Sequence, residues 1–300
     1  MLRRCIGKTG LVRVALVLNP RSGSVDDPDA LVEAIRFRAP DLTVHEVGEH
    51  AAAVATEPDR LIVAGGDGTI ADCFEAAHGA GIELAVLPAG TANDFARAIH
   101  VPLDMAEAIE LATSTSARLQ PTWGGTLAGR PFVNVASIGL AVDAAEHAEE
   151  LKSFAGPLAY GLGAVRAGMA ARPVRAGLVV NDDPVADGRV WQLLIGASGR
   201  FGGGSGLGEA EASERALIAA WVPAGTRLTL PFRAMGLRNR TIERQAGVRW
   251  WRGHHLVVQA RQHGHPVDWN VDGELWRAPT ERLDVRPLGP VAVVVGDAEE

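Results

Sequence analysis

The first third of the chain alternates short apolar or β-branched runs with segments in which apolar residues recur every three or four positions. The short runs predict buried strands over 14–18, 43–47, 61–64 and 83–87. The periodic segments predict helices over 30–38, 70–78, 92–99 and 105–112. Strands and helices that alternate in this way are typical of parallel βαβ units. Residues 1–122 are therefore predicted to form a doubly wound α/β domain, with ligands beyond the carboxyl ends of its strands.

Beyond about Thr122 the pattern becomes one of short apolar segments separated by turns rich in glycine and proline. Such segments predict antiparallel strands, among them 132–135, 176–180, 191–195 and 227–230. We expect residues 123–286 to form a second, antiparallel β domain with a helical insertion over 141–171. A last apolar run over 291–295 could pair with strands of either domain.

Composition and charge narrow the class of protein. The chain is 47% hydrophobic and 22% charged, which is typical of a packed globular protein and argues against disorder. Its net charge of -7 provides no overall basic surface for nucleic acid or anionic lipid, so any membrane contact must be local. Cys5 and Cys73 are too few for a disulfide framework, and a reducing cytoplasm is expected. No apolar run approaches the ~18 to 20 residues that span a bilayer.

A glycine-rich segment, Gly65-Gly66-Asp67-Gly68-Thr69, joins a predicted strand to a predicted helix. Glycine lets backbone amides approach a phosphate closely, and the helix N-terminus adds partial positive charge. Thr69 adds a hydroxyl donor. The Asp67 carboxylate would repel phosphate unless a cation lies between them or the carboxylate holds the loop's own amides. The segment predicts a phosphate-binding turn, and a plain glycine-rich connection is the alternative.

A second strand-to-helix turn of the same kind contains Gly90 and Thr91, followed by Asn93 and Asp94. Adjacent parallel strands end at the same edge of a sheet, so both turns are expected to surround one polyphosphate. Asn93 and Asp94 either face this site or cap the following helix, since both residue types favour that position on any helix.

A third polar loop follows the first predicted strand and reads Asn19-Pro20-Arg21-Ser22-Gly23. Arg21 could meet phosphate charge, because a guanidinium forms charge-assisted hydrogen bonds with phosphate oxygens. Asn19, Ser22 and Gly23 are further candidates for nucleotide binding. The sequence thus has three polar loops at the ends of successive predicted strands.

With these loops the chain resembles the diacylglycerol kinase catalytic-domain family, which includes bacterial soluble lipid kinases and the sphingosine and ceramide kinases. The resemblance covers nearly the whole chain. Its motifs are Asn19-Pro-Arg-Ser-Gly23, Gly65-Gly-Asp-Gly-Thr69, Pro88-Ala-Gly-Thr-Ala-Asn-Asp-Phe95, Asn134-Val-Ala-Ser-Ile-Gly139 with Asp143, Phe201-Gly-Gly-Gly204 and Asp272-Gly-Glu274. It implies an N-terminal nucleotide-binding α/β domain, a C-terminal β-sandwich with the lipid acceptor, and ATP between them. It also implies that residues from about 287 to 300 return to the first domain.

The resemblance further implies that the acidic turn Asp272-Gly273-Glu274 faces the cleft. An alcohol that attacks a phosphoryl group must lose its proton, so Asp272 or Glu274 is the candidate general base. In extended structure both side chains would share one face, and neither is preferred. An Asp-Gly hairpin turn is the alternative interpretation. Asp67 is the candidate ligand for Mg²⁺.

Two further features concern the second domain. Family members carry an acidic turn tied to structural Mg²⁺, but here the matching stretch is Ser213-Glu214-Arg215, with one carboxylate beside a cation. Because hard divalent cations need several oxygen ligands, we expect this metal site to be weakened or absent. Trp250 and Trp251 lie beside arginines, a combination that suits a membrane interface, although burial of at least one is expected.

The resemblance implies an ATP- and Mg²⁺-dependent kinase that phosphorylates a lipid hydroxyl, with diacylglycerol as the first candidate acceptor. The alternatives are an NAD kinase-like enzyme and a non-catalytic regulator that binds nucleotide or lipid. We expect a cytoplasmic protein that contacts lipid substrate peripherally at the inner membrane face and has no nucleic-acid partner. A homodimer is left open, and the sequence does not identify the lipid.

Overall fold

The computed structural model describes residues 12–20, 22, 27–140, 172–201, 205–207, 212–239 and 241–297. The predicted insertion over 141–171 lies outside the described residues, as do Arg21, Gly23 and the three glycines of the 201–204 loop.

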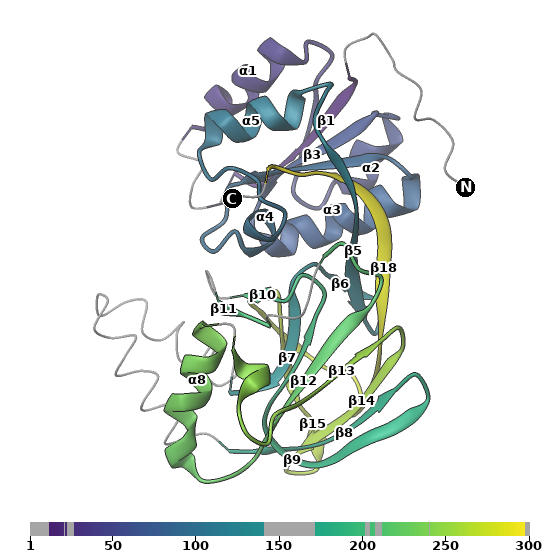
Figure 1. The fold of residues 1–300 in the computed structure, drawn as a ribbon. Coiled ribbons are helices and arrows are strands. Elements are labelled where there is room, and N and C mark those ends of the chain that lie inside the picture. The colour runs from purple at the N-terminus through teal and green to yellow at the C-terminus, as the bar shows by residue number, and fades with distance from the viewer. Residues whose placement is uncertain are drawn as a thin grey trace.

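The N-terminal part is a parallel sheet covered by helices, as predicted (Figure 1). Its strands are β1 (Val14–Leu18), β2 (Thr43–Glu46), β3 (Arg60–Gly65) and β4 (Glu83–Pro88), paired in the order β2-β1-β3-β4. Its helices are α1 (Pro28–Arg38), α2 (His50–Ala55), α3 (Asp67–Ala80), α4 (Asp94–Ala98) and α5 (Met105–Thr113). The sequence pattern does not predict α2, because its alanine-rich run offers little contrast between polar and apolar faces.

The second part is built from antiparallel strands, which confirms the predicted two-part α/β fold class. Its strands are β5 (Leu119–Leu127), β6 (Arg130–Phe132), β7 (Val135–Gly139), β8 (Val174–Val180), β9 (Asp183–Gly196), β10 (Arg200–Phe201), β11 (Ser205–Gly206), β12 (Leu217–Pro223), β13 (Arg249–Gly253), β14 (Leu256–Gln262), β15 (His265–Pro266), β16 (Asp268–Val271), β17 (Glu274–Arg277) and β18 (Arg282–Val294). Within the described ranges, no helix is both long and apolar enough to cross a membrane.

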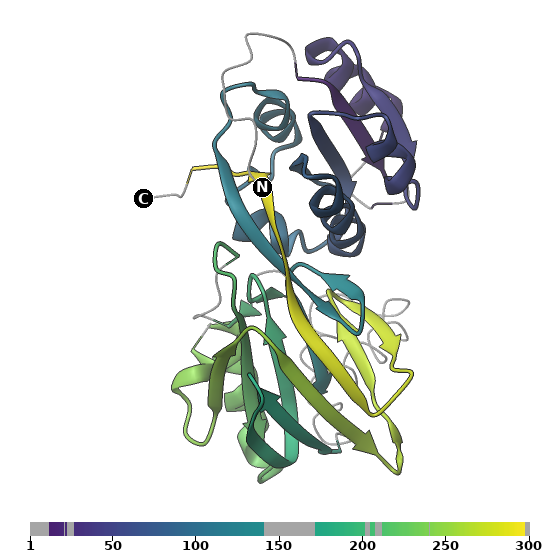
Figure 2. The ribbon, with the colours of Figure 1, turned by 90° about the vertical axis from the view of Figure 1, so that its right-hand side faces the viewer.

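Two long strands, β5 and β18, run side by side from the antiparallel part into the parallel sheet (Figures 1 and 2). The first half of β18 pairs with β14, and its end pairs in parallel with β4 through Val293 and Leu84. The apolar run at the end of the chain therefore completes the N-terminal sheet. Val291 and Val293 are buried in the core of that sheet.

One predicted strand is wrong. Residues 227–230 form the 3₁₀ turn η1 (Arg227–Thr229) and the first residue of helix α8 (Leu230–Arg238). The alternation of Arg227, Leu228, Thr229 and Leu230 suggested a strand. Pro231, however, lies in the first turn of α8, where its fixed φ and missing N–H favour helix initiation. A second 3₁₀ turn, η2 (Ile242–Arg244), follows.

The strands β7, β9 and β12 carry buried apolar side chains on both faces. Leu193 and Ile195 of β9 pack into one core between the antiparallel strands. Leu194 points to the opposite face, where it belongs to a second core that includes Leu230 of α8. Trp191 also belongs to this second core, because the pairing register of β9 with β12 shifts at this residue. Alternating side chains of a strand face opposite sides, so one sheet supports two apolar layers. Helix α8 covers the apolar layer that contains Leu194 and Leu230.

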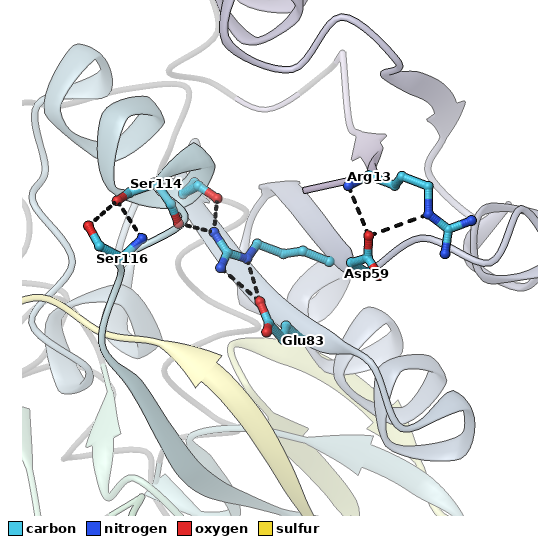
Figure 3. Close-up of polar contacts among 7 residues, drawn as sticks. Arg13, Asp59, Glu83, Ser114 and Ser116 are labelled. Atoms are coloured by element: carbon cyan, nitrogen blue, oxygen red, sulfur yellow. Dashed lines mark hydrogen bonds and ion pairs between the residues drawn. The ribbon is translucent and has the colours of Figure 1, made fainter. Parts of the chain in front are cut away.

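A buried arginine ties the first sheet together. Arg60, at the start of β3, is only 2% exposed. Its Nε and Nη2 donate to Oε2 of Glu83 at 2.9 and 2.7 Å. Its Nη1 donates to the carbonyl oxygens of Ala112 and Ser114 at 2.7 and 2.9 Å (Figure 3). The guanidinium thus joins β3, β4 and the end of α5, and its charge is fully paired.

We expect Arg60→Met to lower the free energy of unfolding by about 3 kcal/mol, because it leaves the Glu83 carboxylate and two carbonyls without their donor. Urea unfolding measures the loss. Arg175→Met is the matched control: Arg175 forms an exposed ion pair with Asp187, worth at most about 1 kcal/mol. Equal effects in both variants would contradict a special role for the buried pair.

Candidate active site

The two glycine-rich turns meet at one edge of the parallel sheet. Gly66 is the N-cap of α3 and follows β3, and Gly90 follows β4. A Cβ atom built on Gly90 would lie 2.7 Å from the Cα of Gly66 and 3.1 Å from Oδ1 of Asn93. The backbones of the two turns are therefore in contact, and only glycine at position 90 permits this approach.

Asn93 holds the second turn in shape. Its backbone is left-handed, with φ of 51°. Its Oδ1 accepts a hydrogen bond from the amide of Gly90 at 2.8 Å, and its Nδ2 donates to the carbonyl of Pro88 at 3.2 Å. No side-chain cap hydrogen bond from Asn93 to α4 is formed. Asn93 therefore shapes the turn, whereas helix capping was the alternative for this residue.

Asp67 connects the two turns electrostatically. It begins α3, and its carboxylate accepts hydrogen bonds from the amides of Phe95 at 3.1 Å and Asp94 at 3.4 Å, in the first turn of α4. Burial raises the pKa of Asp67, and the hydrogen bonds from Phe95, Asn134 and Asp94 oppose that rise. The carboxylate therefore orients α4 against α3. Asp94 itself is buried, with 3% of its surface exposed.

The third predicted loop is described only in part. The amide of Asn19 donates to the carbonyl of Ala64 at 2.9 Å, and the amide of Ser22 donates to the carbonyl of Asn19 at 3.1 Å. The start of this loop is therefore bound to the end of β3, next to Gly65. In the first turn, a Cβ on Gly65 would lie 2.8 Å from Cβ of Thr69, so Thr69 packs over the glycine backbone. Thr91 of the second turn is exposed.

We expect Gly90→Ala to separate the two turns and to lower the free energy of unfolding by about 1 to 3 kcal/mol, because the backbone of Gly66 cannot yield easily. The matched control is Gly79→Ala in α3, where an added Cβ meets nothing within 4 Å. That control should be neutral or stabilise by about 0.5 to 1 kcal/mol. Thermal unfolding of both variants measures the difference. An unchanged Tm for Gly90→Ala would contradict the close approach of the Gly66 and Gly90 backbones.

The acidic segment is an Asp-Gly hairpin turn between β16 and β17, which was the alternative to extended structure. Asp272 has φ of 48° and lies in a tight turn, so it and Glu274 do not share an extended face. The Asp272 carboxylate accepts hydrogen bonds from three successive amides, those of Val133, Asn134 and Val135, at 2.6, 2.9 and 2.9 Å. Burial raises the pKa of Asp272 to about 7, and the charge of Asp67 acts in the same direction.

Glu274 points the other way, toward the first glycine-rich turn. Its Oε1 lies 2.6 Å from the position of a Cβ built on Gly68. Its Oε2 accepts a hydrogen bond from Nη2 of Arg130 at 2.6 Å. The Glu274 side chain is 60% exposed, so it reaches solvent beside the N-terminus of α3. The turn thus provides one carboxylate held in place by backbone amides and one at the solvent boundary.

Arg130 and Asn134 are site residues that the sequence does not single out for these roles. Arg130 follows a short turn and has no motif around it. Asn134 contributes a side-chain hydrogen bond to Asp67 and a backbone amide to Asp272, and its Oδ1 accepts from the hydroxyl of Ser198 at 2.7 Å. Asn134 opens the motif over 134–139, but its role as a link between both carboxylates comes from tertiary contacts that the motif does not reveal.

The residues present suit a Mg²⁺ ion held chiefly by a phosphate ligand. The Asp67 charge raises the pKa of Asp272, so the two carboxylates repel each other, and a cation would relieve this repulsion. In the described part of the chain, no group of three or more His, Cys, Asp or Glu residues is arranged to hold a metal alone. Mg²⁺ usually takes one or two carboxylates together with substrate phosphates and water.

In the second domain, Glu214 forms an ion pair with Arg252. The guanidinium of Arg215 lies 5.6 Å from the ring centroid of Trp123. Glu214, the one carboxylate in the stretch 213–215, is therefore paired with Arg252 of β13. Of the two neighbouring tryptophans, Trp251 packs against the sandwich core and Trp250 is 43% exposed.

Comparison with known proteins identifies the family. A family model described as the diacylglycerol kinase catalytic domain matches residues 13–120. A Pseudomonas aeruginosa protein named "Probable lipid kinase YegS-like" is 31% identical over 291 residues, which cover 92% of each chain. A Staphylococcus carnosus diacylglycerol kinase is 30% identical over 208 residues, covering 64% of this chain and 66% of that protein. The chain belongs to the diacylglycerol kinase catalytic-domain family of lipid kinases, as the resemblance predicted.

Solved structures share the fold. A diacylglycerol kinase from Bacillus anthracis aligns with a TM-score of 0.74 at 21% identity, over 96% of this chain and 99% of that one. An NAD kinase from Archaeoglobus fulgidus in complex with ATP aligns with a TM-score of 0.51 at 12% identity, over 94% of this chain and 93% of that one. At these identities the likeness concerns the fold alone.

Proposed function

We propose that the protein transfers the γ-phosphoryl group of ATP to a lipid hydroxyl in a Mg²⁺-dependent reaction, with diacylglycerol as the first candidate acceptor. The observation that carries this proposal is the contact between Gly66 and Gly90. It brings two glycine-rich turns to one sheet edge, beside the carboxylates of Asp272 and Glu274. Backbone amides that converge near a helix N-terminus suit a polyphosphate.

Each group has a distinct task. The amides of the 65–69 turn and the N-terminus of α3 bind phosphate oxygens, and Asn93 keeps the 90–91 turn in the shape that presents its amides. Asn19 and Ser22 border the same edge, and Asp94 lies at the start of α4. A bound Mg²⁺ would neutralise charge on the phosphates, and Asp67 would hold it.

The proton of the acceptor needs a base. The hydroxyl oxygen forms a bond with the γ-phosphorus as the bond from that phosphorus to the bridging oxygen breaks, and ADP leaves. The hydroxyl proton passes to a carboxylate. Asp272 suits this task, because a base with a pKa of about 7 is half ionised near neutral pH. Glu274, paired with Arg130, positions the neighbouring turn.

A panel assay tests the proposal. Labelled ATP and Mg²⁺ are supplied with diacylglycerol, a sphingoid base, a prenyl alcohol or NAD, and the product is identified by mass. Phosphorylated diacylglycerol is the expected product. Phosphorylated NAD would instead support the NAD kinase alternative. Nucleotide binding without phosphate transfer to any acceptor would support a regulator that lacks catalysis.

We propose a cytoplasmic location with peripheral contact at the inner membrane face, because the acceptor is a membrane lipid and the donor is ATP. Fractionation of cells that express the protein tests this: the protein should divide between the cytoplasmic and membrane fractions, and high salt should shift it toward the cytoplasmic fraction. Full resistance to salt extraction would contradict peripheral contact.

A further inference from the structure

Helix α8 and the preceding turn η1 have apolar residues on two opposite sides. Leu230 is buried against the outer face of the antiparallel sheet, and Leu237 packs against the same core. Leu228, Phe232 and Met235 are exposed by 83%, 74% and 59%. Phe232 and Met235 are three residues apart and lie on one side of α8, and Leu228 lies in the preceding turn η1. Within the part of the chain that the structure describes, the side of η1 and α8 that is not packed on the sheet therefore carries an exposed apolar stripe, formed by Leu228, Phe232 and Met235.

Hydrogen bonds hold the helix against the segment that follows it. Arg233 donates from Nη1 to Oε1 of Gln245 at 3.2 Å and from Nη2 to the carbonyl of Ala246 at 2.8 Å. Gln245 in turn donates to the carbonyl of Phe232 at 2.5 Å. The segment after η2 thus fixes the middle of α8. The apolar stripe is therefore presented by a helix anchored at its middle.

The surrounding sequence is strongly basic. Residues 221–252 contain seven arginines and one acidic residue, Glu243, so this segment has a net charge of about +6. The whole chain has a net charge of -7, so the remainder is strongly acidic. Arg227 and Arg244 are exposed in the turns at either side of α8. An apolar stripe inside a basic segment complements an anionic lipid surface, where both features contribute to binding.

The position of α8 suits delivery of a membrane-embedded acceptor. The helix contacts β11, which pairs with β10, and β10 contacts α4 (Figure 1). Helix α4 begins at the turn that Asp67 holds. A continuous set of packed elements therefore connects the apolar stripe to the candidate active site.

We propose that the stripe formed by Leu228, Phe232 and Met235 inserts into an anionic membrane surface and docks the enzyme there. This inference rests on the proposed function for its purpose, since docking brings the active site to a lipid acceptor. The stripe enters the boundary between headgroups and acyl chains, and Arg227 and Arg244, exposed in the turns at either side of α8, face the lipid headgroups. An anionic membrane surface is the partner that fits both the apolar stripe and the arginines beside it.

The experiment measures binding of the full chain to phosphatidylcholine vesicles with and without phosphatidylglycerol. The combined variant Leu228→Gln, Phe232→Gln and Met235→Gln should bind anionic vesicles about 100-fold more weakly, since each side chain loses part of its transfer free energy. Phe37→Gln is the matched control, because Phe37 is 87% exposed on α1 in the other domain and should change nothing. Circular dichroism and Tm verify that the variants are folded. If the combined variant unfolds, Phe232→Gln alone replaces it and should bind anionic vesicles about 10-fold more weakly than the wild type.

A charge variant tests the electrostatic contribution to vesicle binding. Arg244→Glu should weaken binding to anionic vesicles by about 10-fold and leave binding to neutral vesicles unchanged, because basic residues near the surface add electrostatic attraction. Added salt should weaken wild-type binding in the same direction. Equal binding of the wild type to anionic and neutral vesicles would overturn the electrostatic part of the proposal.

Activity assays separate docking from catalysis. The combined variant should phosphorylate a dispersed short-chain diacylglycerol as fast as the wild type, and a vesicle-embedded one far more slowly. If the wild type phosphorylates neither lipid but vesicle binding responds as expected, the proposed function fails and the docking surface stands. If the combined variant binds vesicles like the wild type, docking through α8 is refuted. Loss of a dimer in light scattering, with unchanged vesicle binding, would show that α8 joins two copies and would also overturn the proposal.

Discussion

Asp67→Ala is expected to lower kcat for phosphoryl transfer by about 10³-fold while the protein remains folded. The carboxylate begins α3, holds the first turn of α4 through the amides of Asp94 and Phe95, and is the candidate ligand for Mg²⁺. Alanine removes all three contributions at the place where phosphate charge must be stabilised. Steady-state kinetics at varied ATP and Mg²⁺ concentrations measures the loss.

The substitution also removes a cap from α4, which costs about 1 kcal/mol of stability on any helix. Asp104→Ala is therefore the matched control, because Asp104 caps α5 by accepting from the amides of Ala106 and Glu107 and belongs to no part of the site. Its stability should fall by a similar amount with kcat unchanged. Activity of Asp67→Ala within severalfold of the wild type would refute the assigned role.

The second large effect is expected from Asp272→Asn, which should lower kcat by about 10² to 10⁴-fold with little change in the KM for ATP. An amide cannot accept the acceptor's proton. The structure adds a second consequence: the amide NH₂ would face one of the three N–H donors at residues 133–135. A loss of about 1 to 3 kcal/mol in unfolding free energy should therefore accompany the loss of rate.

The pH dependence distinguishes a base from a positioning group. Since the pKa of Asp272 is raised to about 7, the ionised form that accepts a proton declines as the pH falls below 7. Wild-type kcat/KM, which reports the free enzyme, should therefore fall about tenfold for each pH unit below that value. The residual activity of Asp272→Asn should lack this acid limb. An acid limb that persists in the variant would assign the titration to another group.

Glu274→Gln is the companion variant and should reduce kcat only severalfold. Glutamine can still accept the hydrogen bond from Arg130, and its exposed position allows it to keep its place beside Gly68. If instead Glu274→Gln shows the larger loss and Asp272→Asn is nearly unaffected, the base is Glu274. If both variants turn over lipid at near wild-type rates, phosphate or water takes the proton and the acidic turn is structural.

The parallel sheet could be predicted from sequence because its strands are buried on both faces. The runs in β1 and β3 are apolar at nearly every position, and each is followed by a glycine or asparagine turn and a helix. The contact between Gly66 and Gly90 then follows from topology, since neighbouring parallel strands end together. The error at 227–230 has a local cause, because a four-residue alternation carries less information than the proline that follows it.

The rest of the site could not be predicted because it depends on pairing between distant strands. The clamp around Asp272 forms because β16 pairs with β7 and brings the turn after β16 to the amides before β7. The ion pair of Arg130 with Glu274 joins residues far apart in sequence. The sequence motif identifies Asp272 and Glu274 as candidate carboxylates. That their side chains point in different directions follows from the left-handed backbone at Asp272, which the motif does not predict.

The long strand β18 has a consequence for biosynthesis. Its last residues complete the N-terminal sheet next to β4, although β18 is made after every strand of the antiparallel part. While the ribosome is still making the second domain, the first sheet lacks a partner for the β4 edge, and Val291 and Val293 are missing from its core. An unpaired edge of this kind invites association with other chains. The N-terminal sheet therefore cannot complete its folding before the antiparallel part is made. In a chain stalled before β18, both parts should remain incompletely folded and be bound by chaperones or degraded by proteases.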